Sequence, residues 1–177
     1  IFIGMDGGAQ KIYALVKKGG EFTNPVLPTD DLTLELADPF ETDISGDFQL
    51  EGYEFTRVPL VIEGTLAGDN QQFRIVVLHT KSKYVHNGRS LWNNQETRMQ
   101  FIVAAMKNRR RISAEAMRTR LYLDELMNQN LNSHMVVTGD FNDGPGIDYF
   151  EKRYLTHNVT DILLGSTYYP NRMFDHA

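Results

Sequence analysis

Polar side chains that can bind phosphate or a metal ion follow an apolar segment near residue 140. Residues 135–137, Met-Val-Val, predict a buried strand covered on both faces, and Gly139 and Gly144 let the chain turn where that strand ends. Side chains two positions apart in an extended segment point to the same side, so Asp140 and Asn142 are predicted to face one pocket. The alternative is that both are turn-forming residues and nothing more.

Two other apolar segments also end on residues that can take part in catalysis. The segment 73–78 leads into His79, and the segment 172–174 leads into Asp175. Active sites of sheet proteins gather where strand ends meet, so we expect these two residues to converge with Asp140 and Asn142. The four are the predicted catalytic residues. Taken singly, His79 is also explained as a hydrogen-bonding core residue and Asp175 as part of a polar terminus.

This combination of an imidazole, an amide and two carboxylates suits metal-assisted attack of water on phosphorus. An aspartate orients or deprotonates the water, while asparagine and histidine donate hydrogen bonds to the phosphoryl oxygens as charge builds on them. The chain has no cysteine, so a metal must be held by oxygen and imidazole ligands, which favours a hard divalent cation such as magnesium. Patterns for a serine nucleophile elbow, a P-loop or an HExxH zinc site are absent from the sequence.

Length and charge limit the class of protein further. A chain of 177 residues fits one domain with a substantial core, and no apolar run approaches the ~20 residues that span a bilayer. A net charge of −5 argues against nonspecific coating of nucleic acid but allows a local basic groove. Absence of cysteine does not fix a compartment.

Several basic residues lie close together between positions 107 and 120. They are Lys107, Arg109, Arg110, Arg111, Arg118 and Arg120. One interpretation is a solvated helix face balanced by Glu115, Asp124 and Glu125. The other is that residues 109–111, together with Lys81 and Lys83, guide a polyanionic substrate.

The elements that must position these residues follow from hydrophobic periodicity and turn residues. Strands are predicted at 11–17, 32–36, 53–64, 73–80, 135–139 and 172–174, with a loop at 38–47. Pro59 cannot donate to a strand ladder and implies an edge or a bulge. A turn at 68–70 predicts a hairpin of two long strands, of which the second, ending at His79, is expected to be central.

Two helices are predicted between the hairpin and the strand at 135–139. The first begins after Asn94 as N-cap, and the second begins at Ser113 and ends near residue 127. A further short helix is predicted at 147–154. The positions expected to be buried are Met99, Ile102, Val103 and Met106 in the first helix, and Met117, Leu121, Leu123 and Met127 in the second.

The predicted catalytic residues and the segments around them resemble the endonuclease/exonuclease/phosphatase superfamily, the deoxyribonuclease I-like proteins. The turn at 139–142, Gly-Asp-Phe-Asn, is similar to the family's signature, Val-Leu-His at 77–79 to its histidine-bearing strand, and Phe-Asp-His at 174–176 to its late aspartate strand. Residues 57–61, Arg-Val-Pro-Leu-Val, resemble its Arg-Glu-Pro strand. The resemblance covers most of the chain from about Tyr13 onward.

The resemblance implies an α/β (α+β) fold, a two-sheet sandwich of mixed, mainly antiparallel sheets flanked by helices. It also implies a magnesium ion, with manganese or calcium as substitutes, held by Asp140 and Asp175. Arg57, Lys81 and Lys83 are expected to bind the substrate phosphate. The implied activity is phosphodiester or phosphomonoester hydrolysis, and the basic residues favour nucleic acid as the substrate.

Three departures from the family pattern lead us to expect a single truncated domain over residues 1–177. The family's metal-binding glutamate motif has no counterpart before Ile12, and its closing Ser-Asp-His motif would lie beyond Ala177. Val58 occupies the position of a glutamate that pairs with the catalytic histidine. We therefore expect the isolated chain to bind metal weakly and to be poorly active or inactive.

The main hypothesis is a magnesium-dependent phosphodiesterase, with a nuclease as the favoured kind. Three alternatives stay open at the sequence level. The first is a lipid or inositol phosphate phosphodiesterase or phosphatase. The second is a non-catalytic relative that binds phosphate or protein. The third is an unrelated α/β protein in which the polar residues only form turns.

Overall fold

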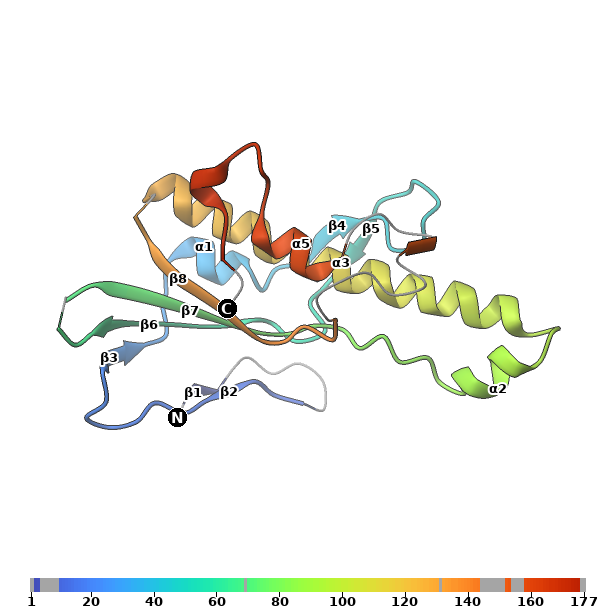
Figure 1. Ribbon diagram of the computed structural model, residues 1–177, viewed down its shortest axis with the longest axis horizontal. Coiled ribbons are helices and arrows are strands. Elements are labelled where there is room, and N and C mark those ends of the chain that lie inside the picture. The colour runs from blue at the N-terminus through green and yellow to red at the C-terminus, as the bar shows by residue number, and fades with distance from the viewer. Residues whose placement is uncertain are drawn as a thin grey trace.

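A mixed four-stranded sheet forms the centre of the chain (Figure 1). The computed structural model describes residues 2–3, 10–68, 70–130, 132–143, 152–153 and 158–175. The strands of the sheet, in spatial order, are β3 (Phe22–Val26), β6 (Leu60–Leu66), β7 (Gln72–His79) and β8 (His134–Asp140). Pairs β3–β6 and β6–β7 are antiparallel and β7–β8 is parallel, so the prediction of a mixed, mainly antiparallel α/β fold is confirmed at that level.

Two small antiparallel sheets accompany the central one. One pairs β1 (Phe2–Ile3) with β2 (Tyr13–Ala14), and the other pairs β4 (Phe40–Thr42) with β5 (Glu51–Tyr53). The predicted strand at 11–17 is therefore reduced to two residues. The predicted strand at 53–64 is divided into β5 and β6, and Pro59, which has no N–H to donate, lies immediately before β6.

The hairpin of β6 and β7 agrees with the sequence prediction. The two strands pair from Leu60 opposite Val77 to Thr65 opposite Gln72. β7 is central, because β6 flanks it on one side and β8 on the other. β8 was predicted to be covered on both faces, and this prediction is wrong. The strand lies at the edge of the described sheet, and several of its residues, Val136 among them, are exposed.

The predicted strand at 32–36 is wrong, because these residues form the helix α1 (Asp31–Glu35). Asp30 is its N-cap, and the Asp30 side chain accepts a hydrogen bond of 3.0 Å from the backbone N–H of Thr33. Such a cap satisfies a donor that would otherwise have no partner in the first helical turn. The local cap therefore outweighs the alternating pattern of Leu32, Leu34 and Leu36.

One long helix replaces the two that were predicted. α3 (Arg98–Gln129) is unbroken and follows α2 (Gly88–Asn93). The N-cap of α3 is Thr97, whereas Asn94, the predicted N-cap, ends α2. The charged stretch at 107–113 contains neither glycine nor proline, and arginine has high helix propensity, so the helix continues through it.

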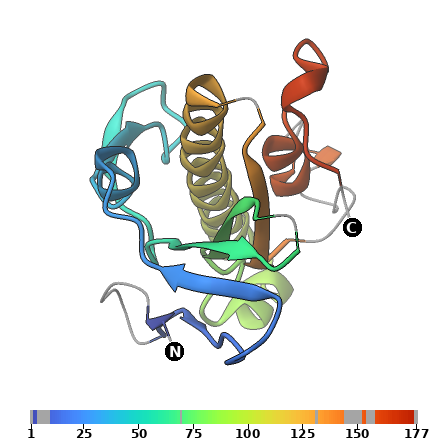
Figure 2. The ribbon, with the colours of Figure 1, turned by 90° about the vertical axis from the view of Figure 1, so that its left-hand side faces the viewer.

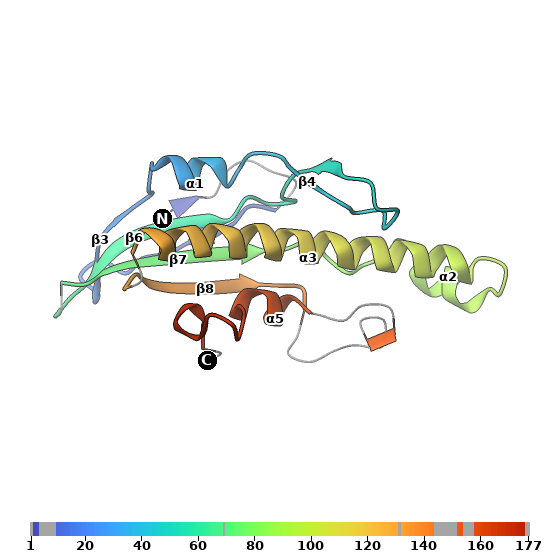
Figure 3. The ribbon, with the colours of Figure 1, turned by 90° about the horizontal axis from the view of Figure 1, so that it is seen from above.

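α3 lies along one face of the sheet, between α1 and β4 on one side and α5 (Val159–Leu164) on the other, as Figures 2 and 3 show.

Of the helix positions predicted to be buried, Met106, Leu123 and Met127 are buried. Those that are exposed instead are Met99, Val103, Met117 and Leu121. The prediction fails at the start of α3 because this part of the helix extends past the strands toward α2 (Figure 3).

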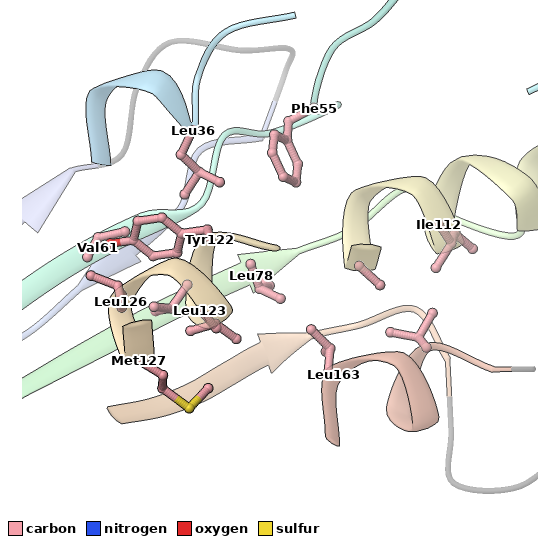
Figure 4. Packing of buried hydrophobic residues seen from close by; sticks show 13 residues of the cluster. Leu36, Phe55, Val61, Leu78, Ile112, Tyr122, Leu123, Leu126, Met127 and Leu163 are labelled. Atoms are coloured by element: carbon pink, nitrogen blue, oxygen red, sulfur yellow. The ribbon is translucent and has the colours of Figure 1, made fainter. Parts of the chain in front are cut away.

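The core has a separate apolar cluster on each face of the sheet. Val61, Val76 and Leu78 contribute to the larger cluster, in which Leu123 of α3 and Leu163 of α5 also pack (Figure 4). On the opposite face, Leu60 and Ile62 pack with Ile12, and Ala14, Phe22 and Val77 border them. Both faces of β6 are thus covered.

The C-terminal part of the described chain is not the predicted strand. Pro170–Arg172 form a 3₁₀ helix, η1, and the next residues are irregular, with the Phe174 N–H donating to the Leu164 carbonyl at 3.0 Å. Proline at the first position has its φ set for a helical turn, which favours this conformation over a strand. The predicted glycine-rich break at 144–146 and most of the predicted helix at 147–154 lie outside the described residues.

Leu123 and Leu121 give a matched pair of variants for the burial of α3. Leu123 is fully buried and Leu121 is 55 % exposed. We expect Leu123→Ala to lower the free energy of unfolding by about 2–5 kcal/mol, because it leaves a cavity, and Leu121→Ala to change it by less than about 0.5 kcal/mol. Urea unfolding measures both, and equal effects would contradict the orientation of α3.

Candidate active site

The ends of β7 and β8 bring His79 and Asp140 together. The two strands are parallel, and their register pairs His79 with Asp140. The Nε2 atom of His79 lies 3.9 Å from Oδ2 of Asp140, with the side chains 26 % and 66 % exposed. This separation is too long for a direct hydrogen bond but short enough for a single water molecule to bridge the two atoms.

Asn142 lies in a tight turn directly after this pair. Its backbone N–H donates to Oδ1 of Asp140 at 2.9 Å, which closes an Asx turn, and its φ of 49° lies in the left-handed region that asparagine tolerates. Its side-chain Nδ2 donates to the Thr80 carbonyl at 2.8 Å. The turn is thereby fixed to the residue that follows His79.

Thr80 is a buried residue that connects the two strand ends further. Its N–H donates to the Asp140 carbonyl at 3.1 Å, and its hydroxyl donates to the Phe141 carbonyl. Together with the bond from Asn142, these contacts fix the relative position of the two loops. Thr80 was not among the residues predicted from the sequence, although it directly follows His79.

Gly139 allows the close approach of β8 to β7 just before Asp140. Its φ is 134°, and a Cβ at this position would lie 1.9 Å from the carbonyl oxygen of Leu78. Any larger residue must therefore displace the strand end. The glycine thus sets the register on which the His79–Asp140 distance depends.

Glu115 of α3 is fully buried and forms hydrogen bonds to the loops around the site. Its Oε1 accepts hydrogen bonds of 2.9 Å from the Tyr53 hydroxyl and the Thr56 N–H, and its Oε2 accepts one of 2.7 Å from the Lys81 N–H. Burial and the nearby Glu115 raise the pKa of Tyr53 well above its usual value, so the phenol stays protonated and donates. The interpretation of Glu115 as part of a solvated face is wrong.

The predicted phosphate-binding residues lie around the same strand ends. Nη1 of Arg57 lies 3.3 Å from the His79 carbonyl and 3.4 Å from that of Thr80. Lys81 follows on the same loop, and Nζ of Lys83 is paired with Asp143, whose other carboxyl oxygen accepts the Val159 N–H at 3.0 Å. Two cationic side chains are therefore attached to the loops that carry the candidate site.

Asp175 is placed differently from the other predicted catalytic residues. It lines a cavity of about 320 Å³ between β8 and α5, which Gly139 and Phe141 also line. Gly139 and Phe141 are the two chain neighbours of Asp140, so Asp175 lies near the end of β8. No contact that the structure describes joins Asp175 to His79.

Arg120 holds the segment that carries Asp175. This buried residue of α3 donates to the carbonyls of Leu163 at 3.1 Å and Arg172 at 2.8 Å, and its guanidinium lies 5.6 Å from the centre of the Phe174 ring. Arg120 is thus a structural clamp between α3, α5 and the chain before Asp175, not a member of a solvated face.

Three further arginines of the basic cluster are also held within the fold. Arg110 donates to the Ser45 carbonyl at 2.8 Å and Arg118 to the Glu35 carbonyl at 2.6 Å, while Arg109 is buried. Neither interpretation of the cluster from sequence anticipated these contacts. Nothing in the local sequence distinguishes such arginines from solvated ones.

The described residues do not by themselves complete a magnesium site. Among them, no group of three or more histidine or acidic side chains is placed to hold a metal ion. Asp140 supplies one exposed carboxylate, and one of its oxygens already accepts the Asn142 N–H. A hard cation prefers six or more oxygen ligands, so further ligands or water would have to contribute.

Comparison of the chain with protein-family models, with curated proteins and with solved structures gives no significant match. In the described part of the chain, none of the helices combines the length and the apolar character needed to cross a bilayer.

The close approach at Gly139 leads to a prediction for thermal unfolding. Gly139→Ala should lower the free energy of unfolding by about 3 kcal/mol, because the added Cβ meets the Leu78 carbonyl. Gly68→Ala is the control, since Gly68 also has a positive φ, 115°, but has open space around it, and we expect a loss of only about 1 kcal/mol. Equal losses in thermal unfolding would show that the contact is unimportant.

The buried carboxyl group of Glu115 leads to a further prediction for stability. Glu115→Gln replaces an acceptor by an amide N–H₂ that faces hydrogen-bond donors, so we expect a loss of about 3 kcal/mol in the free energy of unfolding. Glu125→Gln, on the same helix but exposed, should be close to neutral. Backbone amide NMR shifts should move at Thr56 and Lys81 only in the Glu115 variant.

Proposed function

We propose that this chain carries the phosphate-hydrolysing residues of a metal-dependent phosphodiesterase, with a nuclease as the favoured kind. The observation that carries the proposal is the 3.9 Å separation of His79 Nε2 and Asp140 Oδ2, which suits one shared water. Asn142 and Arg57 are anchored to the same strand ends. The mixed sheet with α3 on one face is also compatible with the deoxyribonuclease I-like sandwich that the sequence resembles.

In the proposed reaction, water attacks the phosphorus in line with the leaving group. Asp140 accepts a proton as the new O–P bond forms, and the opposite P–O bond breaks. The side-chain amide of Asn142 and the His79 N–H that first holds the attacking water both donate to oxygens of the pentacovalent phosphorus, whose negative charge increases in the transition state. The departing alkoxide takes a proton from solvent.

Magnesium and a supporting role for Asp175 belong to this proposal through the family resemblance. When bound, a divalent cation would neutralise charge on the phosphate. The described donors include only one exposed carboxylate beside His79, so we assign no step to the cation. We also infer that this chain alone turns over slowly.

A second candidate function is phosphate binding without catalysis. It is favoured by Val58, which stands where the resembled family has a glutamate partner for the histidine. In this case the same residues bind a phosphate ester, and no bond is broken. Hydrolysis of lipid or inositol phosphates is the other alternative, and the assay below separates it by substrate.

The test is hydrolysis of labelled single-stranded DNA, RNA, sphingomyelin and phosphoinositides, each with magnesium and with EDTA. We expect slow cleavage of nucleic acid with magnesium and none with EDTA. Asp140→Asn should reduce the rate about 100-fold or more, because the water loses its base. Asp38→Asn, at an exposed aspartate in the turn that follows α1, is the control and should leave the rate unchanged.

Binding is measured in parallel with a phosphorothioate oligonucleotide by amide NMR. Shifts at residues 79–81 and 140–142 without cleavage in magnesium or manganese would favour the binding function. Absence of both cleavage and shifts would overturn both candidate functions. Full activity in Asp140→Asn would show that the catalytic residues lie elsewhere.

A further inference from the structure

An open hollow of about 920 Å³ is lined mainly by the loop after β7 and by α2, and Phe101 of α3 completes it. Its lining includes Lys83, Tyr84, Arg89, Trp92 and Phe101. Figures 1 and 3 show this part of the chain, around α2, beyond the end of β7 where His79 lies. The volume is in the range of ligand pockets, which is about 300–1,000 Å³.

The hollow adjoins the candidate active site through Lys83. This residue lines the hollow, and its ammonium group pairs with Asp143, the residue after Asn142. Only three residues separate Lys83 from His79 in sequence. A ligand that spans both places would therefore pass along Lys83.

Two aromatic rings on the wall of the hollow are accessible to solvent. Tyr84 is 70 % exposed and Trp92 is 38 % exposed. The backbone of Tyr84 is fixed, because its carbonyl accepts a hydrogen bond of 2.8 Å from Asn108 of α3 and its N–H donates to the Ser82 hydroxyl at 3.1 Å. An exposed ring on a fixed backbone can stack on a planar ligand with little loss of entropy.

Trp92 is held in place by contacts to α3. Its ring meets Phe101 edge-on at 5.5 Å, and the Arg98 guanidinium lies 5.3 Å from the ring centre. Arg98 also donates to the Trp92 carbonyl at 2.9 Å. The wall of the hollow is therefore preformed.

The charge around the hollow is positive although the chain as a whole has a net charge of −5. Arg89 lines it and Arg98 lies against its Trp92 wall, while the charge of Lys83 is compensated by Asp143 and none of the lining residues is acidic. Cations beside exposed aromatic rings are the combination by which proteins bind single-stranded nucleic acid, the rings stacking on bases and the cations attracting phosphates.

We propose that this hollow binds a nucleobase of single-stranded nucleic acid, and that the phosphate at His79 and Asp140 belongs to another nucleotide of the same strand. This inference rests on the proposed function and specifies its substrate class. An acyl chain carries no charge that could pair with Lys83 and Arg89, and an inositol ring is not a planar π-system that could stack on two exposed aromatic faces. The base stacks on Tyr84, and Trp92 forms the adjoining wall.

Equilibrium binding in EDTA tests the proposal without requiring turnover. Fluorescein-labelled octamers of thymidine, of uridine and of an abasic deoxyribose phosphate are titrated with the chain, and anisotropy gives each Kd. We expect at least one base-containing octamer to bind about tenfold more tightly than the abasic one. Unlabelled octamers should quench the fluorescence of Trp92, which is the only tryptophan of the chain.

The variant Tyr84→Ala should weaken binding of the preferred octamer about tenfold and leave the abasic octamer unaffected. Tyr168→Ala is the matched control, because Tyr168 is also highly exposed but does not line the hollow. Equal Kd values for base-containing and abasic octamers would overturn the proposal. So would quenching of Trp92 by sphingomyelin or phosphoinositide vesicles without quenching by either nucleic acid.

Failure of this inference is distinguishable from failure of the proposed function. Cleavage that depends on Asp140, combined with equal binding by wild type and Tyr84→Ala, overturns the base site alone. Base-dependent binding that requires Tyr84, combined with no cleavage in magnesium or manganese, supports the base site and overturns the hydrolase.

Discussion

The parallel pairing of β7 with β8 is the constraint on which the rest of the structure depends. Two parallel strands cannot be joined by a tight turn. After β7 the chain must therefore return to the opposite end of the sheet, through a long crossover, before β8 can begin. Residues 80–133 make that crossover, and most of it is the single helix α3. The same helix supplies the main apolar cover of one sheet face and carries Glu115 and Arg120, which fix loops at the strand ends. His79 and Asp140 meet because both strands end in register.

Features that depend on neighbouring residues could be predicted from the sequence. The hairpin of β6 and β7 follows from two β-prone runs around a glycine-containing turn, and β7 is central as its apolar sequence indicated. The turn after Gly139 follows from a glycine and an Asx residue at the end of an apolar run. The ends of the strands and the Asp140–Asn142 turn are encoded locally, whereas the parallel pairing that brings His79 to Asp140 joins residues 61 positions apart.

Features that depend on distant contacts could not be predicted in the same way. Leu32–Leu36 alternates like a strand, but its helix is capped by Asp30 and packs through Thr33 on the Tyr122 hydroxyl, 89 positions away. The partners of Glu115 lie 34 to 62 positions earlier, and the carbonyls bound by Arg120 lie more than 40 positions later. A charged residue on a helix gives no local sign that it will be buried. The strand expected before Asp175 failed for a related reason, since Arg120 binds the Arg172 carbonyl, which a strand ladder would need.

The length of α3 also divides the molecule into parts of unequal local stability. The helix is about 48 Å long and β7 about 27 Å, so the helix extends beyond the end of the sheet. Its residues before Ala105 contribute nothing to the buried set, and they pack mainly with α2. This end should open by local fluctuations at a much smaller free energy than the part over the sheet, and its amide hydrogens should exchange faster. The hollow is built on this end, so a bound ligand would slow hydrogen exchange there far more than it would raise the melting temperature of the whole chain.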